Sequence, residues 1–485
     1  MIVLNPNEMQ EFDRFTLESL KINETDLMQK AGLALTKDFL KRVKPKNNAC
    51  LSIFAGVGNN GGDALVMAIE LIKEGFKPNI YVVGNISKAS DAFRYFLDLT
   101  GEIEIIDRLE TLQLIQKSIF ESDYMIDGIF GNGLIREVSG FRTTLFDFIN
   151  TSDTIVYSID FPSGISSING NVLGKGIKAN YTGVVGFYKS GNLLNDAIDY
   201  HGDIKLLDIG IIQKYPINKK YIDLNKYNIE KKERLHNSNK YTYGLTVFIG
   251  GRFSMNGSIQ MSAISALKSG IGLAVVISDI ENGFTQFYPE LIVIDKQSDK
   301  VMSYLKKADT IVFGPGLELD DEYYKTMILE AINCNKKIVV DASGLTYLDY
   351  EKPSNNPNIV LTPHVGELAK IFNKKSKDII NNPLLYINEL TKLNYNVLLK
   401  GPCTIISNGE QTVFMQAKNP GLATAGSGDV LSGIIGANLV SNNPLKAMEL
   451  GVAIHSKASN LAKEKYGETS LIASNIIEFL HEALR

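Results

Sequence analysis

Short runs of β-branched and other apolar residues recur along the chain, and stretches with helical spacing separate them. This periodicity predicts buried strands that alternate with amphipathic helices, which is typical of α/β folds with parallel sheets. The predicted strands of the first half lie within residues 49–56, 79–84, 103–107, 124–130, 154–160, 182–188 and 204–210. Those of the second half lie within residues 245–251, 273–278, 310–316, 337–342, 358–363, 397–401, 404–409 and 412–416.

One segment, residues 214–240, breaks this pattern. It is rich in Lys, Asn and Tyr, is poor in aliphatic residues and has no Gly, so it predicts a surface connector or an irregular domain edge. No internal repeat relates the sequence before this segment to the sequence after it. We therefore expect two unrelated α/β domains, over residues 1–213 and 220–485.

The composition is that of an ordinary globular protein. Of 485 residues, 44% are hydrophobic and 21% are charged, and 50 Lys and Arg against 54 Asp and Glu leave a net charge of −4. This balance gives no electrostatic reason to bind nucleic acid or a membrane. No apolar stretch approaches the roughly 18 residues of a transmembrane helix, and the N-terminus lacks the apolar centre of a signal peptide. Three scattered cysteines argue against a disulfide framework or a zinc site, so we expect a cytoplasmic protein, and we also expect a homo-oligomer.

Three glycine-rich turns mark the first half, each at the end of a predicted strand. The first, at residues 56–62, leads into a helical pattern for which Asp63 is a candidate N-cap. The second follows Asp127 and the third follows Asp160. Because ligands of open α/β sheets bind beyond the carboxyl ends of strands, the three turns predict one shared crevice. Each aspartate taken singly is equally well explained as a turn former.

The first turn contains a G-x-G-x-x-G pattern but lacks two features of the usual nicotinamide-binding fingerprint. No acidic residue ends the next predicted strand to hold a ribose, and Asp63 places a carboxylate where a diphosphate would dock. A tight turn between strand and helix that binds no ligand explains the pattern as readily.

Taken together, NNGGDALVMA, DGIFGNGL and SIDFPSGISSINGNVLG resemble the N-terminal YjeF domain, an NAD(P)H-hydrate epimerase module, over most of residues 1–213. The resemblance implies a Rossmann-like three-layer αβα fold in which Asp160 contacts the reacting ring, and we assign Asp160 as its acid/base. It also implies a potassium ion (K⁺) bound by Asn60, Asp127 and Ser163, whose oxygen atoms suit a hard cation. The implied contacts of the hydrated cofactor are Asn59, Asn60, Gly61, Gly62, Asp63, Gly131, Asn132, Gly133, Leu134, Ile135, Arg136, Glu137 and Asp160.

The most informative motif of the second half is NPGLATAGSGDVLSGII. Gly421, Gly426 and Gly428 precede a helix that is predicted to start near Asp429. A glycine-rich helix start leaves unpaired amides and the positive end of a dipole, which stabilise phosphate oxygens. Asp429 is placed to accept a proton from a hydroxyl that attacks phosphorus, and the alternative is a helix cap after a flexible loop.

With YGLTVFIGGRFSMNGS, TIVFGPGL, VVDASGL and VLTPHVGE, this motif resembles the ribokinase-like superfamily, and within it the ADP/ATP-dependent NAD(P)H-hydrate dehydratases. The match covers nearly all of residues 230–485 and implies a ribokinase-like α/β domain that uses Mg²⁺ with ADP or ATP and has Asp429 as its base. The implied hydrate contacts are Asn256, Gly316, His364 and Asp429. The implied nucleotide contacts are Lys400, Gly401, Pro402, Cys403, Thr404 and Gly428.

Two single positions and one four-residue segment depart from these family patterns. Val57 stands where the epimerase module usually has Pro, and Ser427 stands where the dehydratases often have Thr. Residues 239–242 stand where they often have His-Lys-Gly-Asp. Among the other histidines, His455 is predicted to lie in the core or at an interface, and three are predicted to lie on the surface, namely His201, His236 and His481.

The two resemblances imply one bifunctional enzyme that epimerises the R and S forms of hydrated NADH and NADPH and dehydrates the S form. Hydroxide is a poor leaving group, because water has a pKa of about 15.7, and phosphorylation of the ring hydroxyl removes this obstacle. Two alternatives stay open. One is a small-molecule kinase, for a sugar or a vitamin precursor, with a regulatory Rossmann-like domain, and the other is a non-catalytic scaffold role for the first domain.

Overall fold

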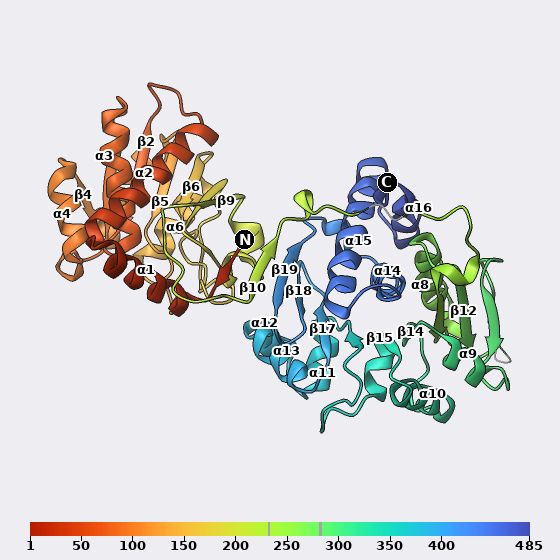
Figure 1. Cartoon of the computed structure of the whole chain (residues 1–485). Helices are drawn as coiled ribbons and strands as arrows, with labels where there is room; N and C mark the ends of the chain where they lie inside the picture. The colour runs from red at the N-terminus through yellow and green to blue at the C-terminus, as the bar shows by residue number, and fades with distance from the viewer. Residues whose placement is uncertain (231–232, 281–283) are drawn as a thin grey trace. The chain divides into compact units, whose positions relative to one another are not determined.

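The computed structural model describes residues 1–230, 233–280 and 284–485, and it divides into two compact units, Met1–Lys219 and Lys220–Arg485. In Figure 1 the first unit runs from red to yellow-green and the second from green to blue. Among the described residues, no helix combines the length and the apolar character that crossing a membrane requires.

The first unit is built on a seven-stranded sheet with the order β4-β3-β2-β5-β6-β7-β9, in which every neighbouring pair is parallel. The strands that follow β2 in the chain, β3 and β4, lie on one side of it, whereas those that follow β5, namely β6, β7 and β9, lie on the other side. The switch point of the sheet is therefore between β2 and β5. Its strands are β1 (Val3–Leu4), β2 (Leu51–Gly56), β3 (Asn79–Val83), β4 (Glu104–Ile106), β5 (Tyr124–Gly128), β6 (Ile155–Ile159), β7 (Tyr181–Val185), β8 (Tyr188–Lys189) and β9 (Asp203–Leu207), of which β1 and β8 form a separate parallel pair.

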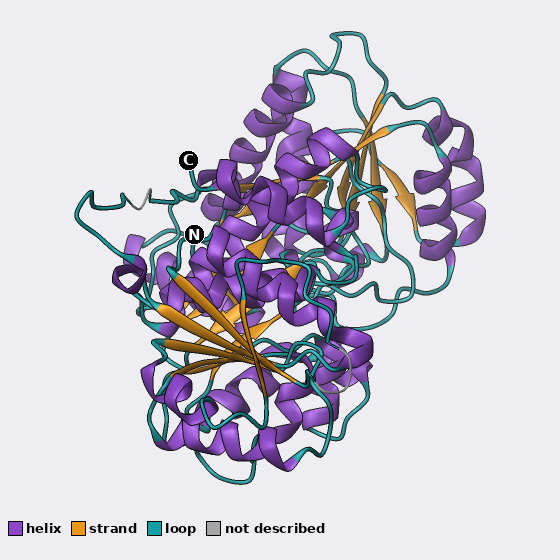
Figure 2. Cartoon of the chain, turned by 90° about the vertical axis from the view of Figure 1, so that its right-hand side faces the viewer, coloured by secondary structure: helices purple, strands orange, loops and turns teal. Residues whose placement is uncertain are grey.

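Helices cover both faces of this sheet, as Figure 2 shows. Alternate residues of one strand supply the two cores: Ile53 and Ala55 pack with α2, α3 and α4, whereas Phe54 packs with α5 and α6. The helices are α1 (Pro6–Leu20), α2 (Glu24–Arg42), α3 (Asn59–Lys73), α4 (Asp91–Thr100), α5 (Leu109–Phe120), α6 (Phe141–Thr151) and α7 (Ala197–Tyr200). The expected three-layer αβα architecture is confirmed.

The second unit contains a ten-stranded sheet with the order β10-β19-β18-β17-β16-β15-β14-β11-β12-β13. The pairs β17–β18 and β18–β19 are antiparallel. The pairs β17–β16, β16–β15, β15–β14, β14–β11, β11–β12 and β12–β13 are parallel. The strands are β10 (Lys219–Ile222), β11 (Leu245–Ile249), β12 (Leu273–Ser278), β13 (Ile292–Asp295), β14 (Thr310–Phe313), β15 (Lys337–Val340), β16 (Ile359–Leu361), β17 (Asn396–Leu399), β18 (Cys403–Ser407) and β19 (Thr412–Gln416).

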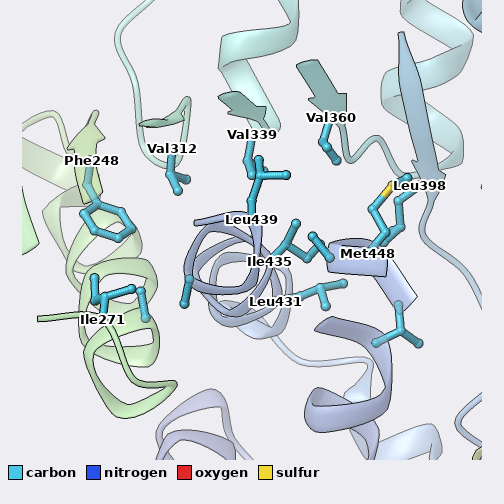
Figure 3. Close-up of a cluster of buried hydrophobic side chains, with 14 of the residues drawn as sticks. Phe248, Ile271, Val312, Val339, Val360, Leu398, Leu431, Ile435, Leu439 and Met448 are labelled. Carbon is cyan, nitrogen blue, oxygen red and sulfur yellow. The ribbon is translucent and has the colours of Figure 1, made fainter. Parts of the chain in front are cut away.

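The main core of this unit lies between the sheet and the helices α8, α14 and α15. Figure 3 shows Phe248, Val312, Val339 and Val360 pointing from neighbouring strands toward Ile435 and other residues of α14. Helices α9 to α13 lie on the other face, and α16 packs on the outer side of α14 and α15. The helices are α8 (Asn256–Lys268), α9 (Val301–Lys307), α10 (Glu322–Asn333), α11 (Val365–Ile371), α12 (Ser376–Asn381), α13 (Pro383–Lys392), α14 (Ser427–Leu439), α15 (Pro444–Tyr466) and α16 (Ala473–Ala483).

Every predicted strand overlaps an observed one, but the short strand β1 and the edge strands β10 and β13 were not predicted. Strand β10 has the sequence KKYI and so lacks the apolar run of a buried strand, whereas β13, with the sequence IVID, has such a run and was missed. Strand β10 falls within residues 214–240, which the sequence predicts as a connector or irregular edge; residues 231–232 of that segment lie outside the described residues.

Candidate functional sites

A cavity of about 820 Å³ lies at the carboxyl ends of β2, β5 and β6 in the first unit, with further walls from α1 and α2. This is the place where the three glycine-rich turns predict a crevice. Ten of the predicted epimerase residues line it: Asn59, Asn60, Asp63, Gly131, Asn132, Gly133, Leu134, Ile135, Arg136 and Asp160. Three other predicted contacts, Gly61, Gly62 and Glu137, are not among the residues that line it.

The first glycine turn is shaped by close packing of backbone. A Cβ on Gly61 would lie 1.6 Å from the carbonyl oxygen of Gly56, and a Cβ on Gly62 would lie 2.3 Å from the sulfur of Met28. Gly61 permits α3 to approach β2 this closely, and Gly62 leaves room for the Met28 side chain of α2. These two glycines therefore bring α3 against β2 and α2, and their neighbours Asn59 and Asn60 face the cavity.

The prediction that Asp63 caps this helix is wrong. Helix α3 begins four residues earlier, at Asn59, with Gly58 as its N-cap. Burial raises the pKa of the Asp63 carboxyl well above its usual range, and the charges of Asp160 and Asp13 raise it further. Asp63 is thus a cavity carboxyl with a raised affinity for a proton.

Asp160, the predicted acid/base, is held in an unusual backbone conformation directly after β6. Its φ angle is +62°, and its carbonyl oxygen accepts a hydrogen bond from the Asn192 side chain at 3.1 Å. The ammonium group of Lys189 donates to Oδ1 of Asp160 at 2.5 Å and to the carbonyl oxygen of Val185 at 3.1 Å. The Lys189 side chain is only 2% exposed, so this ion pair is fixed in the cavity wall.

Two charged residues that line this cavity, Lys189 and Asp13, were not predicted from the sequence. Lys189 ends the apolar run of residues 182–188, and a single buried lysine after such a run is the signal that was available. Asp13 comes from α1, and burial raises its pKa to about 6, with Lys189 lowering it and Asp160 raising it. Nothing in the amphipathic pattern of α1 distinguishes Asp13 from a surface carboxylate.

Asn60, Asp127 and Ser163 meet around the backbone of Phe130. The Asn60 amide donates to the Phe130 carbonyl at 3.1 Å, and the Phe130 amide donates to the Ser163 hydroxyl at 2.8 Å. Ser163 in turn donates to Asp127 through its hydroxyl at 2.5 Å and its amide at 2.8 Å. The three predicted cation ligands thus lie in one hydrogen-bonded group.

This group fits a hard cation. Burial raises the pKa of Asp127, while hydrogen bonds from Ser163, Ser158 and the Ile129 amide act against that rise. These are all neutral donors, and no lysine or arginine of the described residues forms an ion pair with Asp127. A buried carboxylate with only neutral partners, surrounded by amide, hydroxyl and carbonyl oxygens, suits an alkali cation.

The prediction that His201 lies on the surface is wrong. The residue is 2% exposed, its ring packs 5.6 Å from the ring of Phe161, and its Nε2 lies 3.5 Å from the Asn192 amide. Because Asn192 also holds Asp160, His201 belongs to the structure that supports the cavity. His236 and His481 are exposed, and His455 is buried as predicted, with burial lowering its pKa to about 4.

A second polar cluster lies at the carboxyl ends of the second sheet, around the start of α14. Gly426 is its N-cap with φ +85°, and Asp429 lies in the first turn, close to where the sequence predicts the helix to begin. A Cβ on Gly428 would lie 3.3 Å from the ammonium nitrogen of Lys400. The helix start and Lys400, which follows β17, therefore face one another.

The carboxyl group of Asp429 lies among other charged groups. Burial, with the charge of Asp341, raises its pKa to about 6, against the lowering effect of a hydrogen bond from Ser258 and of the charge of Lys400. Lys400 donates to Oδ1 of Asp341 at 2.6 Å and lies 3.9 Å from Oε2 of Glu367. Burial opposes the charge of Lys400, but these carboxylates outweigh it and raise the pKa of the lysine.

Asp341 and Glu367 were not singled out from the sequence, although both lie in motifs that were. Asp341 follows β15 in VVDASG, and Glu367 ends TPHVGE. The available signal for Asp341 was its place at the end of a strand, like that of Asp127. Its contact with Lys400 joins two strands 59 residues apart, which the sequence does not reveal.

His364 lies beside this cluster as the N-cap of α11. Its Nδ1 accepts hydrogen bonds from the amides of Gly366 at 2.9 Å and Glu367 at 3.2 Å, and its Nε2 lies 3.4 Å from Oε1 of Glu367. His364 also forms a parallel bridge with Lys400. More than half of its side chain is exposed, so the ring combines a capping role with an accessible face.

The remaining predicted dehydratase residues lie at the ends of neighbouring elements. Gly316 follows β14 with φ +65° and packs against the carbonyl oxygen of Met255, one residue before Asn256 at the start of α8. Gly401 and Pro402 are exposed, and Thr404 is partly buried in β18. Burial raises the pKa of the Cys403 thiol to about 12, which keeps it neutral.

Comparisons with known proteins divide the chain at the same place. A family model described as NAD(P)H-hydrate dehydratase matches residues 246–481, and one described as YjeF-related protein N-terminus matches residues 24–191. The chain is 31% identical to the bifunctional NAD(P)H-hydrate repair enzyme Nnr of Coxiella burnetii, over 99% of each chain. It is also 31% identical to the protein of the same name from Dictyoglomus turgidum, over 94% of this chain and 93% of that one. A solved ribokinase-like superfamily protein from Enterococcus faecalis V583 is 25% identical, with a TM-score of 0.49, over 56% of this chain and 96% of its own.

Proposed function

The chain belongs to the family of bifunctional NAD(P)H-hydrate repair enzymes, which combine an epimerase with a dehydratase, and from this premise we propose how its residues divide the work. Residues 1–213 form the epimerase domain, which interconverts the R and S forms of hydrated NADH and NADPH. Residues 220–485 form the dehydratase domain, which converts the S form to NADH or NADPH with consumption of ADP or ATP. Neither alternative, a small-molecule kinase or a non-catalytic scaffold role for the first domain, is the function of this family.

In the epimerase domain, Asp160 exchanges a proton with the hydroxyl group on the hydrated ring carbon. Loss of the hydroxyl group needs a proton donor, and return of water to the other face of the ring needs an acceptor. The contact between Lys189 and Oδ1 holds the carboxyl group in one orientation and leaves Oδ2 to exchange the proton. Asp63 and the asparagines of the first turn bind the ligand beside it, since they line the same cavity.

A potassium ion would be held by Asn60, Asp127 and Ser163, whose fit to a hard cation rests on the neutral donors around Asp127. The ion would supply a fixed positive charge next to the cavity. Phe130 links this group to the cavity wall, because its backbone contacts Asn60 and Ser163 and its side chain lines the cavity. The cation group therefore fixes the position of the second glycine turn, residues 129–133.

In the dehydratase domain, Asp429 takes the proton from the ring hydroxyl as the hydroxyl attacks the terminal phosphorus of the nucleotide. The bond between this phosphorus and the bridging oxygen breaks, and AMP leaves from ADP, or ADP from ATP. The amides at Gly426 and Gly428 and the ammonium group of Lys400 stabilise the phosphoryl oxygens during transfer. The lone pair of the ring nitrogen then expels phosphate, which leaves where hydroxide would not. Mg²⁺, bound mainly by the nucleotide phosphates, would add charge neutralisation.

The substrates assigned to this domain are the hydrate, which contacts Asn256, Gly316 and His364, and ADP or ATP, which contacts residues 400–404 and Gly428. The protein acts in the cytoplasm as a homo-oligomer and binds neither nucleic acid nor membranes, in keeping with its balanced charge and its three free cysteines.

The observation that carries this assignment is the position of Asp429 at a helix start opposite Lys400, with a pKa raised to about 6 by burial. The test follows each epimer of hydrated NADPH separately by recovery of the absorbance of reduced nicotinamide. Asp429→Asn should lower recovery from both epimers about 10²- to 10⁴-fold, and Asp160→Asn should slow only the R epimer. Full turnover by Asp429→Asn, or release of a stable phosphate ester, would contradict the mechanism.

A further inference from the structure

The epimerase cavity is lined by carboxyl groups and by basic side chains. Asp13 and Asp63 are both affected by the charges of Asp160 and Lys189, which raise and lower their pKa values respectively. Arg136 and Arg142 also line the cavity, and the positive charge of Arg136 adds to burial in lowering the pKa of Arg142. Besides the group of carboxyls around the Lys189–Asp160 ion pair, the cavity therefore has two guanidinium groups.

Arg142 reaches the cavity from the start of α6. Its guanidinium packs over the ring of Phe141 at 4.6 Å and that of Phe130 at 6.0 Å. A terminal nitrogen of the group lies 3.2 Å from the position of a Cβ on Gly84, the residue that follows β3. The aromatic rings thus hold the charge beside the carboxyl end of β3, next to the first glycine turn.

The two arginines lack compensating negative charge. Neither forms an ion pair with a carboxylate of residues 1–230, 233–280 or 284–485, and the buried Nε of Arg142 has no hydrogen-bond partner among those residues. Two neighbouring guanidinium groups, one of them partly desolvated, are costly without an anion. Their planar donor geometry matches the oxygen atoms of a phosphate group.

We propose that Arg142, together with Arg136, binds a phosphate group of the hydrated dinucleotide in the epimerase cavity. This inference rests on the proposed function of the first domain. The phosphate belongs either to the diphosphate bridge or to the 2′ position of the adenosine ribose, which only the NADPH form carries. In dinucleotide-binding βαβ units the end of the second strand meets this ribose, and an arginine there accommodates a 2′-phosphate. Gly84 occupies that end, so the placement of Arg142 favours the 2′-phosphate.

The test compares Arg142→Gln with the wild-type full chain for epimerisation of hydrated NADPH and hydrated NADH, followed by chromatographic separation of the epimers. The matched control is Arg108→Gln, which removes an exposed charge of the same unit outside the cavity. We expect Arg142→Gln to raise KM for hydrated NADPH about 10- to 100-fold, with kcat little changed and with no effect of the control. Arg142→Lys keeps the charge but loses the bidentate contact, so its KM for hydrated NADPH should lie between those of the wild type and Arg142→Gln.

The two substrates identify which phosphate is bound. A rise in KM for hydrated NADPH alone assigns the 2′-phosphate, and an equal rise for both assigns the diphosphate; either supports the proposal. Unchanged KM for both substrates in Arg142→Gln and Arg142→Lys overturns it. An unfolded Arg142→Gln protein would leave the decision to Arg142→Lys, which retains the packing on both rings.

A binding measurement separates this inference from the proposed function. If the wild-type chain does not epimerise either hydrate, the proposed function fails, whereas calorimetric titration with NADP⁺ and NAD⁺ still tests the phosphate contact. We expect Arg142→Gln to weaken NADP⁺ binding by about tenfold or more relative to Arg108→Gln. Equal NADP⁺ affinities in these two variants would overturn the inference by itself.

Discussion

Replacement of Lys189 by methionine tests how the epimerase cavity holds its acid/base. The side chain has nearly the same length, so the change removes the charge and leaves most of the packing. At 2.5 Å and an effective dielectric constant of about 20, the attraction between Lys189 and Asp160 is on the order of 7 kcal/mol before desolvation is subtracted. Loss of one partner from a buried pair costs about 3–5 kcal/mol, because the other charge stays buried without compensation.

The control is Lys175→Met, which breaks an ion pair with Asp147 in the same unit. Both of those side chains are substantially exposed, so its loss should cost no more than about 1 kcal/mol. Calorimetric unfolding of the full chain measures the two free energies, and epimer-resolved kinetics measures the activities. In a double-mutant cycle, adding Asp160→Asn to Lys189→Met should recover part of the lost stability, because the neutral amide needs no cation.

The result that would refute this reasoning is a Lys189→Met protein as stable as Lys175→Met and with wild-type epimerisation. Asp160 would then not depend on the buried cation. A stable protein that has lost epimerisation would separate the two roles, and it would place Lys189 in the positioning of the acid/base but not in the folding of the unit.

Three further predictions concern pH, ions and packing. Because burial raises the pKa of Asp429 to about 6 and the base acts when ionised, dehydration should be lost as the pH falls through about 6; a pH-rate profile that stays flat down to pH 4 would contradict this. Replacing potassium by choline should slow epimerisation without affecting dehydration of the S form, and Ser163→Ala should weaken the response to potassium. Gly61→Ala should destabilise the first unit by about 3 kcal/mol or more, since its Cβ would lie 1.6 Å from a carbonyl oxygen, whereas Gly133→Ala, with open space around it, should shift the unfolding midpoint little.

The architecture could be predicted from the sequence because its strands are buried on both faces. Runs such as LTVFI and TIVF are apolar throughout, and glycine turns follow directly where parallel strands end at the ligand-binding edge. The same logic located Asp127, Asp160 and Asp429, each of which stands at the end of a strand or the start of a helix. The edge strand β10, with the sequence KKYI, was not predicted because it lacks an apolar run, whereas β13, with the sequence IVID, has one and was missed.

Contacts between residues that are distant in the sequence could not be predicted from it. Lys189 contacts Asp160 only because a two-residue strand, β8, brings it there, and Asp13 reaches the cavity from a helix that precedes the region matched by the family model. Asp341 follows β15 and meets Lys400, which follows β17, across the end of the intervening strand β16. His201 has polar neighbours in sequence, yet its ring packs on Phe161 in the core. Each of these depends on distance in space between residues that no local pattern connects.

A crystal structure of the full chain soaked with NADPH and ADP tests the central claim most directly. The account predicts electron density for ADP with its terminal phosphate at Gly428 and Lys400, within reach of the Asp429 carboxyl, and a nicotinamide ring in the cavity of the first unit near Asp160. Nucleotide phosphates bound away from the start of α14, with Asp429 facing only protein, would contradict the assignment of the dehydratase site.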